Sequence, residues 1–205
     1  MNVKLKGAGW QAILLATLAL TAGHAWSQDH AARAKKIVNG VCFLCHGADG
    51  LSSSEVFPKL AGQNADYIAK QLENFKSGKR KSSAMAEMSA KLTPEEMLAL
   101  GSYYAAMPNP REAAKDGGLA AVGQYIFLSG NKFSGVPACA SCHGKEAVGS
   151  AALPRLAGQF SGYLETQLKL FHQRERTNDN AVMHAVVEKM TPLEMAAVAE
   201  YLSGQ

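Results

Sequence analysis

Two five-residue stretches decide the fold: CFLCH at residues 42–46 and CASCH at residues 139–143. Each has two cysteines three positions apart, followed at once by a histidine, and together they use all four cysteines of the 205-residue chain. Two thiols at this spacing reach the two vinyl groups of one porphyrin, and a histidine in the next position is then held beneath the iron. The pattern predicts two covalently bound haem c groups. Attachment is expected at Cys42 and Cys45 and at Cys139 and Cys142, with His46 and His143 as iron ligands.

Other uses of cysteine fit the two motifs less well. A disulfide-exchange site needs no histidine after its second cysteine, and ordinary disulfides leave both histidines unexplained. A structural zinc site needs its four ligands in one place, whereas these two pairs belong to separate repeats. Haem attachment is the interpretation that uses every residue of both motifs.

The sequence around these motifs is an internal repeat. The sequence FPKLAGQ at 57–63 returns as LPRLAGQ at 153–159, and KLTPEEM at 91–97 returns as KMTPLEM at 189–195. A nearly constant offset over most of each half indicates a duplication into two domains rather than chance.

The duplication also predicts the domain boundaries. We expect a first domain at 28–107 and a second at 116–205. Residues 108–115, which follow Met107 and carry two prolines and mixed charge, are the expected linker.

Both halves read as helical, so the predicted fold class is all-α. Apolar residues recur at helical spacing, as at Ile68, Leu72 and Phe75, and no segment alternates like a strand. The pairs Thr93–Pro94 and Thr191–Pro192 combine an N-cap residue with a proline in the first helical position. Shorter helices are expected before the cysteine motifs, at about 30–39 and 118–128. Domains this small bury little surface on their own, and a large apolar prosthetic group would complete each core.

The N-terminus has the pattern of an export signal. Lys4 and Lys6 precede an apolar run at 11–22, and small residues follow up to Ser27. This order is typical of a secretory signal peptide at 1–27, cleaved near residues 25–27, and the run is short for a membrane span. We therefore expect a periplasmic protein, soluble or peripheral to the membrane.

Charge argues against one class of function. The chain has 21 Lys and Arg against 17 Asp and Glu, and no block of like charge stands out. Nucleic-acid binding therefore has no electrostatic support in the sequence.

The sixth ligand of each iron has to come from another part of the domain. Methionine is the soft ligand that raises the potential of an electron carrier, and a ligand used by both repeats should recur in both. Met85 recurs as Met183, and both are expected between helices, where a loop wraps over the haem. Met97 recurs as Met195 and is the competing pair, although its place on the apolar face of the last helix is typical of core packing.

Other residues near the predicted sites have two interpretations each. The carbonyls of Pro58 and Pro154 either accept a hydrogen bond from the ligand histidine or belong to plain loop prolines. Arg80 and Arg176 either pair with haem propionates or end a helix in solvent. Tyr67 and Tyr163 are expected either in the core or in contact with the propionates. Met88 and Met190 are expected in the core. His172 and His184 are expected at the surface, and His30 is expected to be solvated.

The order of the motifs resembles the di-haem cytochrome c4 family. The shared elements are CHGADG, FPKLAGQ and YIAKQL before Met85, repeated as CHGKEAVG, LPRLAGQ and YLETQL before Met183, and they span essentially the whole mature chain. The resemblance implies two tandem class I cytochrome c domains, each wrapped round one covalently attached haem. It also implies iron ligation by His46 with Met85 and by His143 with Met183. His184 departs from the family, which often has arginine there.

The resemblance also implies a function. It points to a periplasmic electron carrier between redox partner proteins, such as a membrane or periplasmic donor and a terminal oxidase, and not to an enzyme. The alternative is a di-haem electron-accepting subunit of a periplasmic dehydrogenase, for example a sulfide-oxidising flavocytochrome. A di-haem peroxidase or thiosulfate-oxidising cytochrome is less favoured, because attachment uses every cysteine and both halves offer the same methionine.

Overall fold

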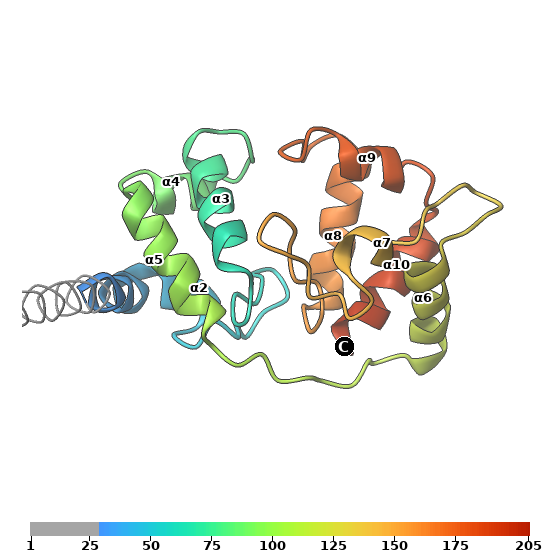
Figure 1. Ribbon diagram of the computed structural model, residues 1–205, viewed down its shortest axis with the longest axis horizontal. Coiled ribbons are helices and arrows are strands. Elements are labelled where there is room, and N and C mark those ends of the chain that lie inside the picture. The colour runs from blue at the N-terminus through green and yellow to red at the C-terminus, as the bar shows by residue number, and fades with distance from the viewer. Residues whose placement is uncertain (1–28) are drawn as a thin grey trace, which may run out of the picture.

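The computed structural model describes residues 29–205 as two bundles of helices, which lie beside each other in Figure 1. The described residues contain no strand, only an isolated antiparallel bridge between Asn131 and Val136, so the all-α prediction is confirmed. None of the helices in this part of the chain is both long and apolar enough to cross a membrane. The predicted signal peptide at 1–27 lies outside the described residues.

The helices follow the same order in both repeats. In the first repeat a helix over 29–37 continues through a π-helical turn into the first cysteine motif, whereas in the second a loop separates the two. The elements of the first repeat are η1 (Val38–Cys42), α2 (Phe43–His46), α3 (Ala65–Lys76), α4 (Ser83–Ser89) and α5 (Pro94–Ala105). Those of the second are α6 (Gly117–Ser129), α7 (Ala140–His143), α8 (Ser161–His172), α9 (Val182–Val187) and α10 (Pro192–Ser203). The helices predicted before the cysteine motifs are confirmed.

The last helix of each repeat begins where the sequence predicts. The Thr93 hydroxyl accepts from the N–H of Glu96 at 3.2 Å, and the Glu96 carboxylate accepts from the N–H of Thr93 at 3.0 Å. Thr191 and Glu194 make the same reciprocal pair at the start of α10. Each of these reciprocal pairs, known as a capping box, satisfies two backbone N–H donors that the start of a helix otherwise leaves unpaired. The proline that follows the threonine has no N–H to satisfy.

Each repeat has its own apolar core, built on one face of this last helix. The face packs against α3 and the helix over 29–37 in the first repeat, and against α6 and α8 in the second. Its buried residues are Met97, Leu100 and Tyr104 in α5, and Met195, Val198 and Leu202 in α10. Met97 and Met195 thus lie on the apolar face of the last helix, as the sequence predicts.

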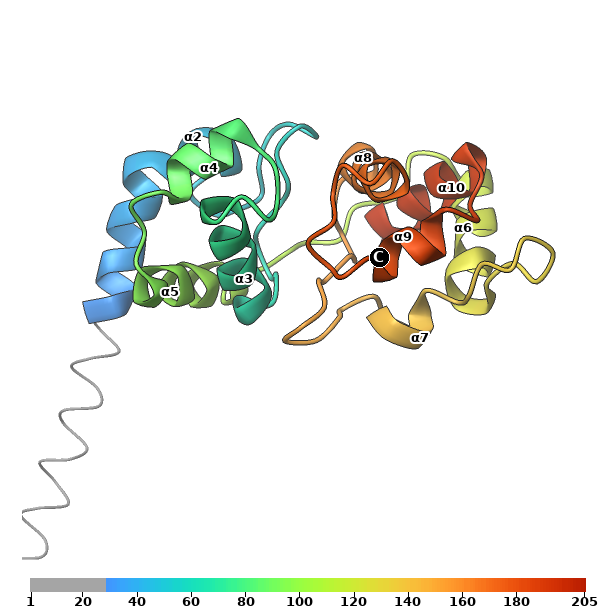
Figure 2. The ribbon, with the colours of Figure 1, turned by 90° about the horizontal axis from the view of Figure 1, so that it is seen from above.

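The two repeats present their cysteine motifs differently. Seen from above in Figure 2, α2 and α4 lie at one edge of the first repeat and α7 lies at the opposite edge of the second. The two cysteine motifs therefore face opposite sides of the molecule. The chain between α5 and α6 is irregular and runs along one side of both bundles (Figure 1).

Tight helix packing in the second repeat depends on one glycine. Helices α6 and α10 approach so closely that a Cβ atom at Gly123 would overlap the carbonyl oxygen of Ala197. A Cβ there would also lie 2.9 Å from the Cβ of Tyr201. No larger residue fits this contact without moving one of the helices.

The variant Gly123→Ala should lower the free energy of unfolding by about 2 kcal/mol or more, because α6 and α10 must separate to admit the methyl group. Gly117 begins the same helix and has open space around it, so Gly117→Ala is the matched control and should be neutral or slightly stabilising. Urea denaturation of the haem-loaded protein, followed by circular dichroism, measures both. Equal stability of the two variants would contradict the tight contact.

Candidate functional site

The two cysteine motifs place their thiols in distinct environments. Cys42 and Cys139 are half-buried and pack against the cores of their own repeats, whereas Cys45 and Cys142 are exposed. Burial raises the pKa of Cys42, and it raises the pKa of Cys139 to about 11. All four thiols are free, so each repeat offers two thiols to a single prosthetic group.

The histidine of the first motif is buried and fixed in orientation. His46 is 8% exposed, and its Nδ1 lies 2.9 Å from the carbonyl oxygen of Pro58. A carbonyl oxygen only accepts, so Nδ1 carries the proton and Nε2 keeps its lone pair, which is the form that binds a metal. Burial lowers the pKa of His46 and favours this neutral ring, while the Pro58 carbonyl acts in the opposite sense. Of the two interpretations of Pro58, the structure supports the acceptor.

The second motif differs in one contact. His143 is equally buried, and burial lowers its pKa, with the Pro154 carbonyl opposing the shift. Its Nδ1 is nevertheless buried without a hydrogen bond. The Pro154 carbonyl raises the pKa of His143 as a hydrogen-bond acceptor does, so both repeats direct the histidine at a proline carbonyl, and the geometry is favourable only at His46.

The two methionines predicted as ligands are half-buried, but they lie in helical turns. Met85 is in α4 and Met183 is in α9, so the expectation of a loop between helices is wrong. The N–H of Met85 donates to the Ser82 hydroxyl at 3.3 Å, and the N–H of Met183 donates to the Asp179 carboxylate at 2.5 Å. A side-chain acceptor just before each methionine satisfies its N–H, which allows a short helix to start there.

The competing methionines belong to the cores. Met97 is 2% exposed and Met195 is 3% exposed, on the buried faces of α5 and α10, which fits their predicted packing role. Met190 is buried as predicted. Met88, in contrast, is 42% exposed, so its expected place in the core is wrong. Helix α4 turns Ser89 inward instead, and the hydroxyl of Ser89 donates to the Met85 carbonyl at 2.7 Å.

The histidines outside the motifs have mixed outcomes. His172 is exposed, as predicted, and His30 is half-buried rather than solvated. His184 is not a plain surface residue, because its Nδ1 lies 3.0 Å from the Phe171 carbonyl and its Nε2 accepts from Arg174 at 2.9 Å. These bonds tie α9 to the end of α8.

A cluster of arginine, tyrosine and glutamine joins the two repeats. Arg80 donates to the Tyr163 hydroxyl at 2.8 Å and to the Gln167 amide oxygen at 2.9 Å. Arg176 donates to the Tyr67 hydroxyl at 2.9 Å and to Gln167 at 2.8 Å. Each guanidinium therefore reaches the tyrosine of the other repeat, a contact that no local pattern in the sequence signals.

The cluster holds two positive charges without a paired acid. Arg176 is 8% exposed, so a solvated helix end is wrong for it. It stacks on Phe171 with its guanidinium carbon 4.5 Å from the ring centre, and Arg80 stacks on Phe75 at 4.7 Å. Among the ion pairs of residues 29–205, none involves either arginine. Two partly desolvated cations side by side favour an anion between or beside them.

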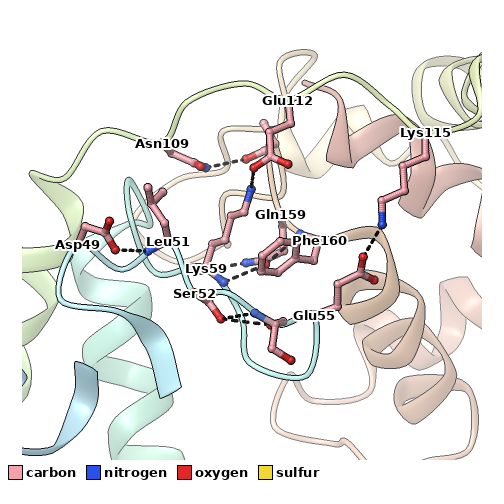
Figure 3. A network of polar contacts seen from close by, with 12 residues as sticks. Asp49, Leu51, Ser52, Glu55, Lys59, Asn109, Glu112, Lys115, Gln159 and Phe160 are labelled. Atoms are coloured by element: carbon pink, nitrogen blue, oxygen red, sulfur yellow. Dashed lines mark hydrogen bonds and ion pairs between the residues drawn. The ribbon is translucent and has the colours of Figure 1, made fainter. Parts of the chain in front are cut away.

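The repeated LAGQ sequence makes a second set of contacts between the repeats. The Gln159 side chain accepts from the N–H of Lys59 at 2.9 Å and donates to the carbonyl of Lys59 at 2.9 Å (Figure 3). Gln63 accepts from the N–H of Arg155 at 2.7 Å and donates to its carbonyl at 2.9 Å. Each glutamine thus clamps the backbone of the other repeat, a role that the sequence alone did not reveal.

Ion pairs bind the linker to the first repeat, next to the contact between Gln159 and Lys59. Glu112 lies 2.6 Å from the ammonium of the buried Lys59, and Lys115 lies 2.5 Å from Glu55 (Figure 3). Glu55 also accepts from the N–H of Gly162 at 3.2 Å, in the first turn of α8, which has no side-chain cap of its own. The linker and the first repeat therefore both contribute to the second repeat's position.

The residues present fit one c-type haem in each repeat. Each has two free thiols at the required spacing and a buried neutral histidine in the next position. The paired guanidinium groups between the repeats suit carboxylates such as propionates. Within the described part of the chain, no three His, Cys, Asp or Glu side chains gather as a site for a bare metal ion.

Comparison with known proteins gives matches over both repeats. The cytochrome c family profile matches residues 31–126 and again residues 120–205. Cytochrome c4 from Thiocapsa roseopersicina is 41% identical over 170 residues, which are 81% of this chain and 88% of that protein. A thiosulfate dehydrogenase electron acceptor from Stutzerimonas stutzeri is 41% identical over 167 residues, 79% of this chain and 77% of that protein.

A solved structure extends the similarity to the fold. The crystal structure of reduced recombinant cytochrome c4 from Pseudomonas stutzeri matches with a TM-score of 0.80 at 34% identity. The match covers 85% of this chain and 97% of that chain, so it includes both repeats and their arrangement.

Removing one tyrosine hydroxyl tests the cluster between the repeats. Tyr67→Phe should lower the free energy of unfolding by about 1–2 kcal/mol, because it leaves an N–H of the buried Arg176 without that acceptor. Tyr163→Phe should cost less, since Arg80 is more exposed and water replaces the lost partner. Tyr125→Phe, on the exposed side of α6, is the matched control and should be neutral. Chemical denaturation of the haem-loaded protein orders the three variants, and a neutral Tyr67→Phe would contradict the buried contact.

Proposed function

This chain belongs to the cytochrome c family, as a tandem di-haem electron-transfer cytochrome of the c4 type with two covalently bound haem c groups, and we propose that it carries electrons in the periplasm. The proposed donor is a membrane or periplasmic protein, and the proposed acceptor is a terminal oxidase. The observation that carries the proposal is the buried His46, held by the Pro58 carbonyl with Nε2 free, directly after a pair of free thiols.

The proposed axial ligands are His46 with Met85 in the first domain and His143 with Met183 in the second. The helical turns of α4 and α9 support the methionines, because the N–H groups of Met85 and Met183 both donate to side chains. When bound, each haem iron supplies one-electron chemistry between its ferric and ferrous states. A haem iron held by both a histidine and a methionine would leave no position for substrate or water, so the protein's own role would be to fix potential and orientation.

The propionates are the proposed partners of the arginine cluster. Arg80 and Arg176 have no acid partner among the described residues, and a propionate would neutralise each of them. Tyr67 and Tyr163 hold the guanidinium groups in place from the opposite domain. A buried cation beside a haem destabilises the more positive ferric state and therefore raises the potential.

The proposed domains are 28–107 and 116–205, joined by a linker at 108–115. Two separate apolar cores and an irregular stretch between α5 and α6 support this division. The proposed signal peptide at 1–27 and the attachment motifs support a periplasmic location, because c-type haem is joined to exported chains.

A second function is favoured by a specific observation. Relatives named thiosulfate dehydrogenase electron acceptors are as similar to this chain as the cytochromes c4, at 41% identity. The alternative proposal is therefore an electron-accepting partner or subunit of a periplasmic dehydrogenase, with thiosulfate dehydrogenase as the leading case and a sulfide-oxidising flavocytochrome as another. The haem chemistry is the same in both proposals, and only the donor differs.

The oxidised haem-loaded protein should contain two low-spin haems per chain, both with the sulfur-to-iron charge-transfer band of methionine ligation. Met85→Ala and Met183→Ala should each abolish one half of that band and lower the potential of one haem, because the soft sulfur ligand is lost. Optical and electron paramagnetic resonance spectra with a haem count measure all three proteins.

The competing methionines supply the control. Met97→Ala should reduce stability by about 2–4 kcal/mol as a core truncation while leaving both bands in place. Loss of a band in Met97→Ala together with its retention in Met85→Ala would reverse the ligand assignment. One high-spin haem in the unmodified protein would instead favour the enzyme alternative.

The donor is tested by reduction kinetics. The oxidised protein is mixed with a purified thiosulfate dehydrogenase and thiosulfate, and separately with membranes containing a reduced quinol-oxidising complex. Rapid reduction by the first mixture alone would favour the dehydrogenase partner. Rapid reduction by the second alone would favour the respiratory carrier.

A further inference from the structure

One peptide group connects the ligand histidine of the first domain to a side chain of the second. The carbonyl of Pro58 accepts from Nδ1 of His46 at 2.9 Å. The N–H of the same peptide group, which belongs to Lys59, donates to the Gln159 amide oxygen at 2.9 Å (Figure 3). The two bonds are therefore in series across the domain boundary: imidazole to carbonyl, and N–H to glutamine.

The surroundings keep water away from this series. His46 and Gln159 are 8% and 7% exposed, and Lys59 is 5% exposed. Gln159 is held a second time, because it also donates to the Lys59 carbonyl at 2.9 Å. Hydrogen bonds in such a low-dielectric place polarise one another, since water does not compete for the donors and acceptors.

We propose that Gln159 is a positioning residue for His46, the iron ligand of the other domain, and that it acts through the Pro58–Lys59 peptide group. This role rests on the iron ligation by His46 given under the proposed function. An acceptor on the peptide N–H makes the carbonyl a stronger acceptor, which draws the Nδ1 proton and makes Nε2 a stronger donor to iron. A stronger donor stabilises ferric iron, so Gln159 lowers the potential of the first haem.

The second domain offers the matched comparison. Gln63 makes the same two bonds to the backbone of Arg155, so it contributes equally to holding the domains together. The peptide group that Gln63 holds lies between Pro154 and Arg155, so it faces His143 and not His46. Loss of Gln63 therefore removes as many bonds from the interface as loss of Gln159 does, without touching the peptide group that accepts from His46.

The test uses Gln159→Leu in the haem-loaded full chain. Leucine has a similar size and removes both hydrogen bonds. The variant should raise the potential of the first haem and shift the distribution of electrons toward it by about twofold to fivefold. The two haems are followed separately by their methyl proton resonances during a potentiometric titration, with Met85→Ala identifying the first haem.

Gln63→Leu is measured beside it as the control for a loosened interface, and it should leave the first haem unchanged. A selective rise at the first haem in Gln159→Leu alone supports the role. An unchanged or lowered first haem in Gln159→Leu overturns it, and so does an equal shift of that haem in both variants. Failure of the proposed function would be seen in the unmodified protein, as missing methionine-ligated haem, before either variant is made.

A measurement on the unmodified holoprotein covers the case in which Gln159→Leu fails to fold. The Lys59 amide should exchange with solvent deuterium at least about a hundredfold more slowly than the amide of the exposed Val56, which donates to the Ser54 hydroxyl. The ring Nδ1 proton of His46 should also be protected. Exchange of the Lys59 amide at the rate of the Val56 amide would overturn the series of bonds on which the role depends.

Discussion

The hydrogen bond between His46 and the Pro58 carbonyl is the constraint on which much of the structure depends. It joins the cysteine motif to residues 58–63, and the same residues form half of the contact with the other domain. Lys59 is clamped by Gln159, and Gln63 reaches across to Arg155. The peptide group between Pro58 and Lys59 therefore serves both the proposed ligand histidine and the contact with Gln159.

Glycine keeps this segment against its own domain. Gly62 has a φ of 67°, in the left-handed region, and its N–H donates to the Tyr104 carbonyl at the end of α5 at 2.9 Å. Gly158 has a φ of 75° and makes the equivalent bond to Leu202 at the end of α10. The repeated LAGQ sequence is explained by this pairing: glycine allows the turn onto the last helix, and glutamine leaves the turn toward the other domain.

Local chemistry made much of this predictable from sequence. The thiol spacing indicated the attachment sites, and the threonine–proline pairs fixed where α5 and α10 begin. The errors concern residues whose surroundings the comparison of the two repeats does not show. Comparison with the repeat placed Met88 in the core, although the outer surface of α4 exposes it. It gave Arg176 a haem propionate or solvent as its surroundings and missed Tyr67, which lies 109 positions away in the chain. A repeat shows which positions are equivalent, but it does not show that the two copies bind each other.

The reciprocal glutamine contacts have a consequence for assembly. Gln63 binds the backbone of the second domain, and Gln159 binds the equivalent backbone of the first. The two contacts therefore form a closed two-fold arrangement, with no contact site left unused on either domain. A head-to-tail contact of the same strength would leave one open half on every molecule and would let chains add without limit. Here the linker keeps both halves in one polypeptide, at an effective concentration set by its own length. The haem pair therefore stays together however dilute the protein becomes, and its stoichiometry is a property of the chain and not of the solution.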